Sequence, residues 1–382
     1  MPTLASGAAI AVNDRRHELS LLPSFPRSVR QPADLPIRRW ALVVVAAAAA
    51  ASSACSDGRT PLVIYSPHGR ELLSLAEQQF EAANPQVDVR WLDMGSQDAL
   101  DRVRSERANP QADVWFGGPS ALFRRAAAES LLAAYRPSWA DAIPLRGHGA
   151  GELYFAVYET PAVIAYNSDA VTAETAPADW DDVLEPRWTG KVIIRDPLAS
   201  GTMRTIFGML VQRGLAATGD TAAGFGWLRR LDAQTREYVF NPALLHQKLL
   251  RQEGWVTLWD LPDILVEQGK GAPFDFVLPK SGTPVIEDAI AIVRGTEHQE
   301  AARWFVEWVG TAEAQLMAAR QAFRLPARVD LPEDSLPKWA RDVRAGLVVA
   351  EMDWELLSER GSHWMAYWDR NVRGRGRAAT GR

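Results

Sequence analysis

The feature that most constrains the fold of this chain is a double series of short apolar runs that alternate with helical patterns. In the first series, residues 62–65, 87–92 and 113–116 have the length and composition of buried strands. Residues 72–80 between them place apolar side chains on one helical face, and Asn84-Pro85 ends that helix. Strands that alternate with helices predict βαβ units and a mostly parallel sheet.

The alternation starts again in the second half of the chain. Residues 155–166 form a long extended segment, and strand patterns follow at 191–194, 255–259 and 272–278. No low-complexity linker separates the two series. We therefore predict an α/β fold with two doubly wound lobes joined by crossing strands, near 155–166 and near 273–279.

Length and composition fit this division. A chain of 382 residues suits two domains, and 47% hydrophobic residues can form a full core. We expect 55–160 plus 275–310 to form lobe 1, 161–274 to form lobe 2, and 311–382 to form C-terminal helices packed on lobe 2. The formal net charge of −5 argues against a nucleic-acid partner. We expect a monomer.

The first 54 residues have the features of a leader with an export signal. Arg38-Arg39 precede an apolar stretch at 40–51, and small residues lead to Cys55, the single cysteine. A lone cysteine cannot form an internal disulfide, and its position resembles a bacterial lipobox. We expect a periplasmic protein held to the membrane by a lipid on Cys55, with a soluble periplasmic form and a signal anchor as alternatives.

Five further segments resemble one known family in their order along the chain. They are Ala165–Ser168, Trp180–Leu184 with Trp188–Lys191, Asp196-Pro197 with Ser200–Thr202, Lys280–Pro284 followed by Ala289–Val293, and the Trp-rich stretch Trp354–Trp368. Together they are similar to the ferric-iron, phosphonate and polyamine branch of the extracellular solute-binding proteins of ABC importers. The resemblance implies a type 2 periplasmic binding protein, in which two lobes close over a ligand and present it to permease subunits.

Candidate binding residues come from loops that precede helices. In open α/β sheets, ligands bind beyond the carboxyl ends of strands, where helix N-termini offer N–H groups to anions. Small residues such as Gly201 leave room for a ligand beside the backbone. The predicted ligand-binding residues are Ser66, His68, Gly69, Gly118, Ser120, Ser200, Gly201, Thr202, Trp259 and Asp260.

Each of these has a structural interpretation as well. Ser120 and Ser200 are suitable helix caps, and Asp260 begins the N-cap sequence Asp-Leu-Pro-Asp. His68 is equally suited to a polar loop, and Trp259 to the core or the wall of a cleft.

The ligand is predicted to be a small anionic or zwitterionic solute, such as a phosphonate, a phosphate ester or a carboxylate. Ferric-binding relatives use adjacent tyrosines, whereas this chain has Leu258-Trp259-Asp260 at the corresponding position. Ferric iron remains an alternative, as does a polyamine bound by Asp260, Asp263 and Glu159. We expect no metal ion and no cofactor, because the sequence has no His-Glu-x-x-His pattern and no cysteine cluster.

Two other classes of function remain open. A sensor that presents its ligand to a membrane receptor uses the same fold. A cleft enzyme is the third class, but the chain has no Gly-x-Ser-x-Gly elbow, and we expect no enzymatic activity.

Overall fold

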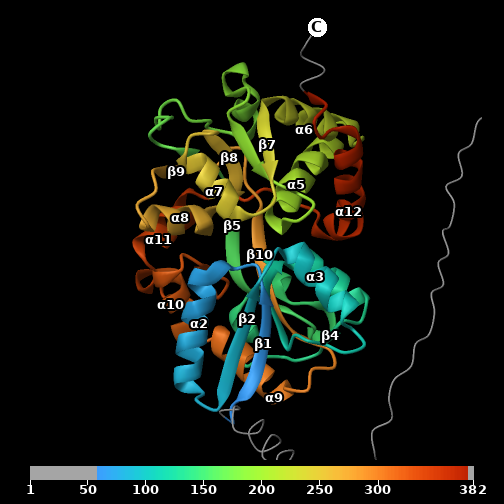
Figure 1. Cartoon of the computed structure of the whole chain (residues 1–382), viewed down its shortest axis with the longest axis vertical. Coiled ribbons are helices and arrows are strands. Elements are labelled where there is room, and N and C mark those ends of the chain that lie inside the picture. Colours follow the sequence, from blue (N-terminus) through green and yellow to red (C-terminus); the bar gives the residue numbers. More distant parts are fainter. Residues whose placement is uncertain (1–57, 377–382) are drawn as a thin grey trace, which may run out of the picture. The chain divides into compact units, whose positions relative to one another are not determined.

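The two predicted α/β lobes are present in the computed structural model, which describes residues 58–376 (Figure 1). The lobes share one continuous sheet with the strand order β2-β1-β3-β10-β5-β8-β6-β7. Its strands are β1 (Thr60–Ser66), β2 (Val87–Asp93), β3 (Val114–Pro119), β4 (Leu132–Ala133), β5 (Phe155–Asn167), β6 (Val192–Arg195), β7 (Thr235–Val239), β8 (Val256–Asp260), β9 (Phe274–Val277), β10 (Val285–Val293) and β11 (Leu325–Pro326).

The first lobe is built around β1, β2 and β3, which run parallel as predicted. Three helices alternate with these strands: α2 (Gly69–Ala83), α3 (Ser96–Ser105) and α4 (Ser120–Ala128). The predicted apolar face of α2 is buried, from Leu72 to Phe80. Burial of this face against the sheet removes apolar surface from water, which is the main force that holds such a helix in place.

The second lobe repeats the arrangement around β6, β7 and β8. Its helices are α5 (Gly201–Thr218), α6 (Ala222–Gln234), α7 (Pro242–Leu250) and α8 (Leu261–Gly269). In α5 the positions predicted from the sequence, from Met203 to Leu210, are buried, and so are Arg204 and Thr205. The first half of α5 is therefore enclosed on most sides, which an amphipathic helix on a sheet face would not be.

The strand β5 crosses between the lobes, as predicted for residues 155–166. Its first half pairs with β10 in the first lobe, and its second half pairs with β8 and β9 in the second. The return crossing falls a few residues later than expected, because β9 (Phe274–Val277) still pairs within the second lobe. The chain then passes back between Val277 and Val285, where the Ala162 N–H donates to the Pro284 carbonyl.

The C-terminal helices divide between the lobes. They are α9 (Gln299–Val309), α10 (Ala312–Gln321), α11 (Lys338–Gly346) and α12 (Trp354–Asn371). Trp364, Met365 and Trp368 of α12 join the core of the second lobe. Ala318 of α10 instead joins the core of the first lobe, which differs from the expectation that all of 311–382 packs on lobe 2.

Short 3-10 helices complete the described part of the chain. They span Ala140–Ala142, Leu145–Gly147, Ala150–Glu152, Trp180–Leu184, Pro186–Trp188 and Glu333–Ser335. Within residues 58–376 no helix combines the length and the apolar character that a membrane crossing requires. Cys55 and the predicted export signal lie outside the described residues.

Candidate functional site

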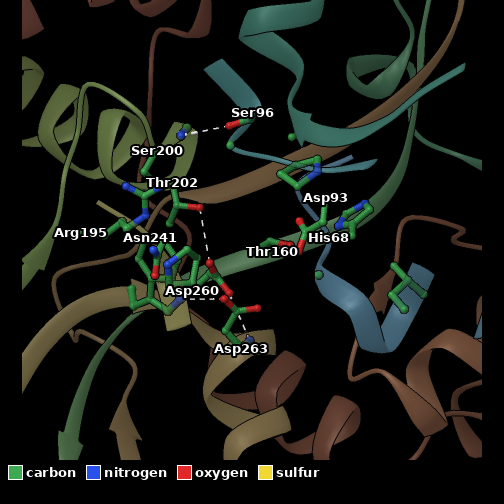
Figure 2. Close-up of a pocket in the computed structure, with 18 of the residues that line it drawn as sticks. His68, Asp93, Ser96, Thr160, Arg195, Ser200, Thr202, Asn241, Asp260 and Asp263 are labelled. Carbon is green, nitrogen blue, oxygen red and sulfur yellow. Dashed lines mark hydrogen bonds between the residues drawn. The ribbon is translucent and has the colours of Figure 1, made fainter. Parts of the chain in front are cut away.

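A cavity of ≈ 610 Å³ lies where the two lobes meet, and loops from both lobes line it. Small-molecule sites typically enclose about 300–1,000 Å³. Eight of the ten predicted ligand-binding residues line this cavity: His68, Gly69, Gly118, Ser200, Gly201, Thr202, Trp259 and Asp260. Figure 2 shows labelled residues that converge on it from opposite sides.

Ser66 and Ser120 do not line the cavity. Ser66 is fully buried at the end of β1, and its hydroxyl accepts a hydrogen bond from the His68 N–H at 3.2 Å. Ser120 is the first residue of α4 and bonds Glu287, while Pro119 occupies the N-cap position. Ser120 is therefore not the helix cap that the sequence suggests. Neither Ser66 nor Ser120 lies in the wall of the cavity where we expect the ligand.

One end of the cavity, which we call the basic end, comprises Arg195, Ser200, Thr202 and Asn241 (Figure 2). Arg195 ends β6 and is 3% exposed. Its Nη1 donates only a long bond of 3.4 Å to the Val239 carbonyl, and its buried Nε has no partner. Among the described residues, no carboxylate lies within 4 Å of its guanidinium. Burial lowers the pKa of Arg195, with Asp196 and Asp98 acting in the opposite direction.

Helix ends complete the basic end. Ser200 is the N-cap of α5, and its hydroxyl accepts from the Met203 N–H at 3.2 Å, so the capping interpretation is confirmed. Asn241 caps α7 in the same way, accepting from the Leu244 N–H at 2.8 Å. Both helices therefore direct the positive ends of their dipoles at the surroundings of Arg195.

The backbone amides of the predicted residues Gly69, Gly118 and Gly201 already have partners within the protein. The Gly69 N–H donates to the Asp93 carboxylate, and the Gly118 N–H donates to Asp288 at 3.0 Å. The Gly201 N–H donates to the Ser96 hydroxyl at 3.0 Å, across the boundary between the lobes. These loops lie where the sequence predicts, but the amides expected to bind an oxyanion are used to position side chains.

Residue 201 has to be glycine because side chains of the first lobe pack directly against its backbone. A Cβ at this position would lie 2.3 Å from the Ser96 Oγ and 2.7 Å from Pro119 Cδ. The space where we expect a ligand from the sequence is thus occupied by two residues of the opposite lobe. Gly117, with φ +99°, makes the same kind of room for the His68 ring.

The other end, the acidic end, comprises Asp93, Asp260, Asp263, Asp288 and the guanidinium of Arg324. Burial raises the pKa of Asp288 and raises that of Asp260 well above its ordinary value, with Asp263 adding to both shifts. Burial also raises the pKa of Asp93. These carboxylates are therefore costly to ionise together without a neighbouring cation.

Arg324 partly compensates the acidic end. The residue is 6% exposed. Its Nη2 donates to the His68 carbonyl at 2.8 Å and lies 3.9 Å from the Asp263 Oδ1. Its buried Nε has no partner. One cation thus faces four carboxyl groups, and a second cation at this end would favour their ionised forms.

His68 and Trp259 form apolar and neutral parts of the wall. Burial and the charge of Arg324 lower the pKa of His68 well below its ordinary value, so the ring is neutral at pH 7. The ring packs edge-on against Phe116 and Tyr158. Trp259 is 3% exposed and donates from its indole nitrogen to Asp263 at 3.0 Å. Its indole is thus part of the wall that fixes a carboxylate.

The sequence predictions omit Asp93, Asp288, Arg195 and Arg324. Asp93 and Arg195 end strands β2 and β6, so the rule that ligands bind at the carboxyl ends of strands could have found them. Asp288 lies within β10 and Arg324 follows α10, positions that carry no local signal. Within residues 58–376, no group of three His, Cys, Asp or Glu side chains is arranged to hold a metal ion.

The chain matches one protein family and several curated relatives. Residues 76–345 match the family described as bacterial extracellular solute-binding protein. A probable ABC transporter periplasmic-binding protein, y4fP of Sinorhizobium fredii, is 29% identical over 324 residues, covering 82% of this chain and 86% of that protein. A putative 2-aminoethylphosphonate-binding periplasmic protein of Salmonella typhimurium is 26% identical over 290 residues, covering 74% and 82% respectively.

A solved structure shows the same fold. The periplasmic binding protein AfuA from Actinobacillus pleuropneumoniae, with exogenous fructose-6-phosphate bound, superimposes with a TM-score of 0.73 at 25% identity. The superposition covers 84% of this chain and 100% of that structure.

Proposed function

Because the chain belongs to the bacterial extracellular solute-binding protein family, we propose that it is the binding component of an ABC importer for a small solute with an oxyanion group. The solute is a phosphonate, a phosphate ester or a carboxylate, captured between the lobes and delivered to permease subunits. The observation that carries this proposal is Arg195, a buried cation without a carboxylate partner among the described residues, at the basic end of the cavity.

An unpaired buried guanidinium is unfavourable until an anion reaches it. Its planar donors match the oxygens of a phosphonate or a carboxylate, and the pair of charges is stronger in a cavity than in water. The Ser200 hydroxyl lies beside it and can donate to a further ligand oxygen, whereas the Thr202 hydroxyl donates to Asp260 at 3.5 Å. We infer that the anionic group of the solute binds at this end.

The acidic end favours a zwitterion over a simple anion. Seven carboxylates line the cavity against four cationic side chains, namely Glu71, Asp93, Asp98, Asp260, Asp263, Glu267 and Asp288 against Arg70, Arg195, Lys270 and Arg324. A polyanion would be repelled by this balance, whereas an ammonium group would compensate the carboxylates that Arg324 leaves unpaired. We infer that the solute carries an amino group at its other end.

Calorimetry on the mature protein tests this proposal with three matched probes. 2-Aminoethylphosphonate has both groups, ethylphosphonate lacks the amine, and ethanolamine lacks the phosphonate. We expect binding in that order of affinity, with ethanolamine the weakest. Fructose-6-phosphate and ferric citrate serve as further probes, and tight binding of ferric citrate alone would contradict the proposal.

A polyamine is the second candidate, and the four carboxylates of the acidic end favour it. Its cationic groups would share the cavity with Arg195, whose charge has no counterion within 4 Å among the described residues. Spermidine is therefore included in the titrations. If it alone binds, the solute class is a polyamine and Arg195 has another role.

We further propose that binding occurs without turnover and leads to import instead of sensing. Phosphorus NMR of 2-aminoethylphosphonate incubated with the protein should show no new resonance. Deletion of neighbouring permease genes should abolish uptake of the solute, whereas a sensor would leave uptake intact.

The lobe boundaries and the anchor are also proposals. We infer that 55–160 with 275–310 moves against 161–274 as one hinge, which small-angle scattering would detect as a smaller radius of gyration with ligand. We propose that a monomer is attached through a lipid on Cys55. In that case Cys55→Ala should move the protein from the membrane fraction to the soluble periplasm.

A further inference from the structure

A second, much smaller cavity lies between the lobes, beyond Gly201 as seen from the ligand cavity. Helices α4, α5 and α12 line it, and it shares just Pro119 and Gly201 with the ligand cavity. Its charged lining residues are Arg125 of α4 and Arg204 of α5. The cavity thus places two cations from opposite lobes at one position, with no carboxylate in its lining.

Arg204 is a buried cation without a counterion. It is 8% exposed, and among the described residues no carboxylate lies within 4 Å of it. Its Nη2 donates to the Leu198 carbonyl at 3.3 Å, and its buried Nε has no partner. Burial, together with the charge of Arg125, lowers the pKa of Arg204 to about 10.

The two guanidinium groups converge on a single hydroxyl. Arg125 Nη1 and Arg204 Nη1 donate to the Ser362 Oγ at 2.9 Å and 3.0 Å. A hydroxyl oxygen has two acceptor positions, so the O–H of Ser362 remains available to donate. Two like charges held at a neutral oxygen repel each other, and the cost falls mainly on Arg204, which is buried, whereas Arg125 is half-buried and Ser362 is exposed.

The nearest acidic side chains do not supply the missing charge. Asp101 acts on Arg204 and Glu129 responds to Arg125, in both cases only through space. Both carboxylates are instead bonded to Arg104. The balance of charge at the small cavity is therefore positive.

We propose that this cavity is a binding site for one small monatomic anion, such as chloride, which joins the two lobes. Its size of ≈ 10 Å³ leaves room for a single small occupant, which can enter from solvent beside the exposed Ser362. The anion accepts from both guanidinium groups and from the Ser362 O–H. Because Arg125 belongs to the first lobe and Arg204 and Ser362 to the second, the bound anion stabilises the arrangement in which the lobes are together. This site is independent of what the larger cavity binds.

Thermal unfolding in chloride and in gluconate at equal ionic strength tests the site. We expect the melting temperature of the unliganded mature protein to be about 2 °C higher in chloride. Arg125→Gln and Ser362→Ala remove one donor from each lobe, and both should lose this difference. Arg124→Gln, an exposed neighbour on α4, is the matched control and should keep it. Comparing variants cancels the general effect of salts on protein surfaces.

Crystals grown in bromide give a direct view of the occupant. We expect an anomalous peak between Arg125 and Arg204 in the wild type and none in Arg125→Gln. An equal chloride response in the wild type and either cavity variant would overturn the proposal. So would the lack of an anomalous peak in the wild type, which would leave water as the occupant.

Discussion

The two ends of the ligand cavity are built in opposite ways. The basic end comes from the second lobe alone, and its central charge, Arg195, has no counterion within 4 Å among the described residues. The acidic end draws Asp93 and Asp288 from the first lobe and Asp260 and Asp263 from the second, around Arg324. The basic end is thus assembled within one lobe, whereas the acidic end is complete only when the two lobes meet.

We expect the two ends of the cavity to contribute differently to binding. In the proposed binding mode, a ligand held at Arg195 by its anionic group presents its other end to carboxylates from both lobes. A cation there compensates charges that would otherwise oppose closure. The basic end should therefore set affinity for the oxyanion, and the acidic end should couple the ligand to the hinge.

The largest effect is expected from Arg195→Gln. Removing one partner of a buried charge pair costs about 2–5 kcal/mol, so affinity for 2-aminoethylphosphonate should fall roughly 30-fold to several-thousand-fold. The stability of the unliganded protein should be unchanged or higher, because an uncompensated buried charge is removed. Calorimetry and urea unfolding measure the two quantities.

The control for Arg195 is Arg187→Gln, an exposed arginine of the same lobe paired with Glu185. It removes the same formal charge away from the cavity and should bind as the wild type does. If Arg195→Gln and Arg187→Gln have equal affinities, the anionic group binds elsewhere and the contrast between the two ends is wrong.

Asp260→Asn tests the acidic end and should have the second largest effect. Asparagine preserves the N-cap of α8, in which Asp260 accepts from the Asp263 N–H at 3.2 Å, so the change removes mainly charge. A charge-assisted hydrogen bond is worth about 1.5–3 kcal/mol. We expect 2-aminoethylphosphonate to bind roughly 10- to 150-fold more weakly.

Ethylphosphonate supplies the contrast for this variant. It has no amine, so Asp260→Asn should bind it as well as the wild type does, or better. A parallel loss for both probes would mean that Asp260 acts through the helix cap and not through a ligand cation.

A smaller effect is expected from Ser200→Ala. The lost cap of α5 should lower the free energy of unfolding by about 1 kcal/mol. Affinity for the phosphonate should fall less than in Arg195→Gln, because the hydroxyl already accepts from Met203 and donates only one bond to a ligand. Unchanged stability would contradict the cap, and a larger loss of affinity than in Arg195→Gln would contradict the leading role of the arginine.

The smallest expected effect is on the pH dependence of stability. Burial raises the pKa of Asp288 above its ordinary value of 3.8, so between these values the folded state holds a proton that the unfolded state has lost. Its contribution to stability is present below 3.8 and is lost as pH rises through the raised pKa. Urea unfolding of the unliganded protein gives the free energy of unfolding at each pH from about 4 to about 7. Over this range the free energy of unfolding should fall less steeply, or rise more steeply, in Asp288→Asn than in the wild type.

Asparagine at 288 can still accept from the Gly118 N–H and can donate to Thr160, so the packing of the loop is retained. Identical pH profiles in the two proteins would indicate that Arg324 already compensates Asp288 fully. In that case the acidic end would not need a ligand cation to close.

Local sequence patterns predict the elements of the fold because each pattern reports a local cause. The apolar face of α2 and the buried positions of α5 follow from helical spacing, and the crossing strand β5 follows from a long extended segment in which two apolar runs flank Glu159-Thr160-Pro161. The position of α10 is missed because a short helix rich in alanine has no pattern that specifies which lobe it joins.

The sequence alone indicates where strands end and where helices begin. Residues chosen at these positions are in eight of ten cases part of the cavity wall. What these residues do there depends on partners far along the chain. Gly118 donates to Asp288, 170 residues away, and Gly201 donates to Ser96, 105 residues away. Only the tertiary structure brings such partners together, because hydrogen bonds and charge pairs depend on distance in space and leave no periodic trace in the sequence.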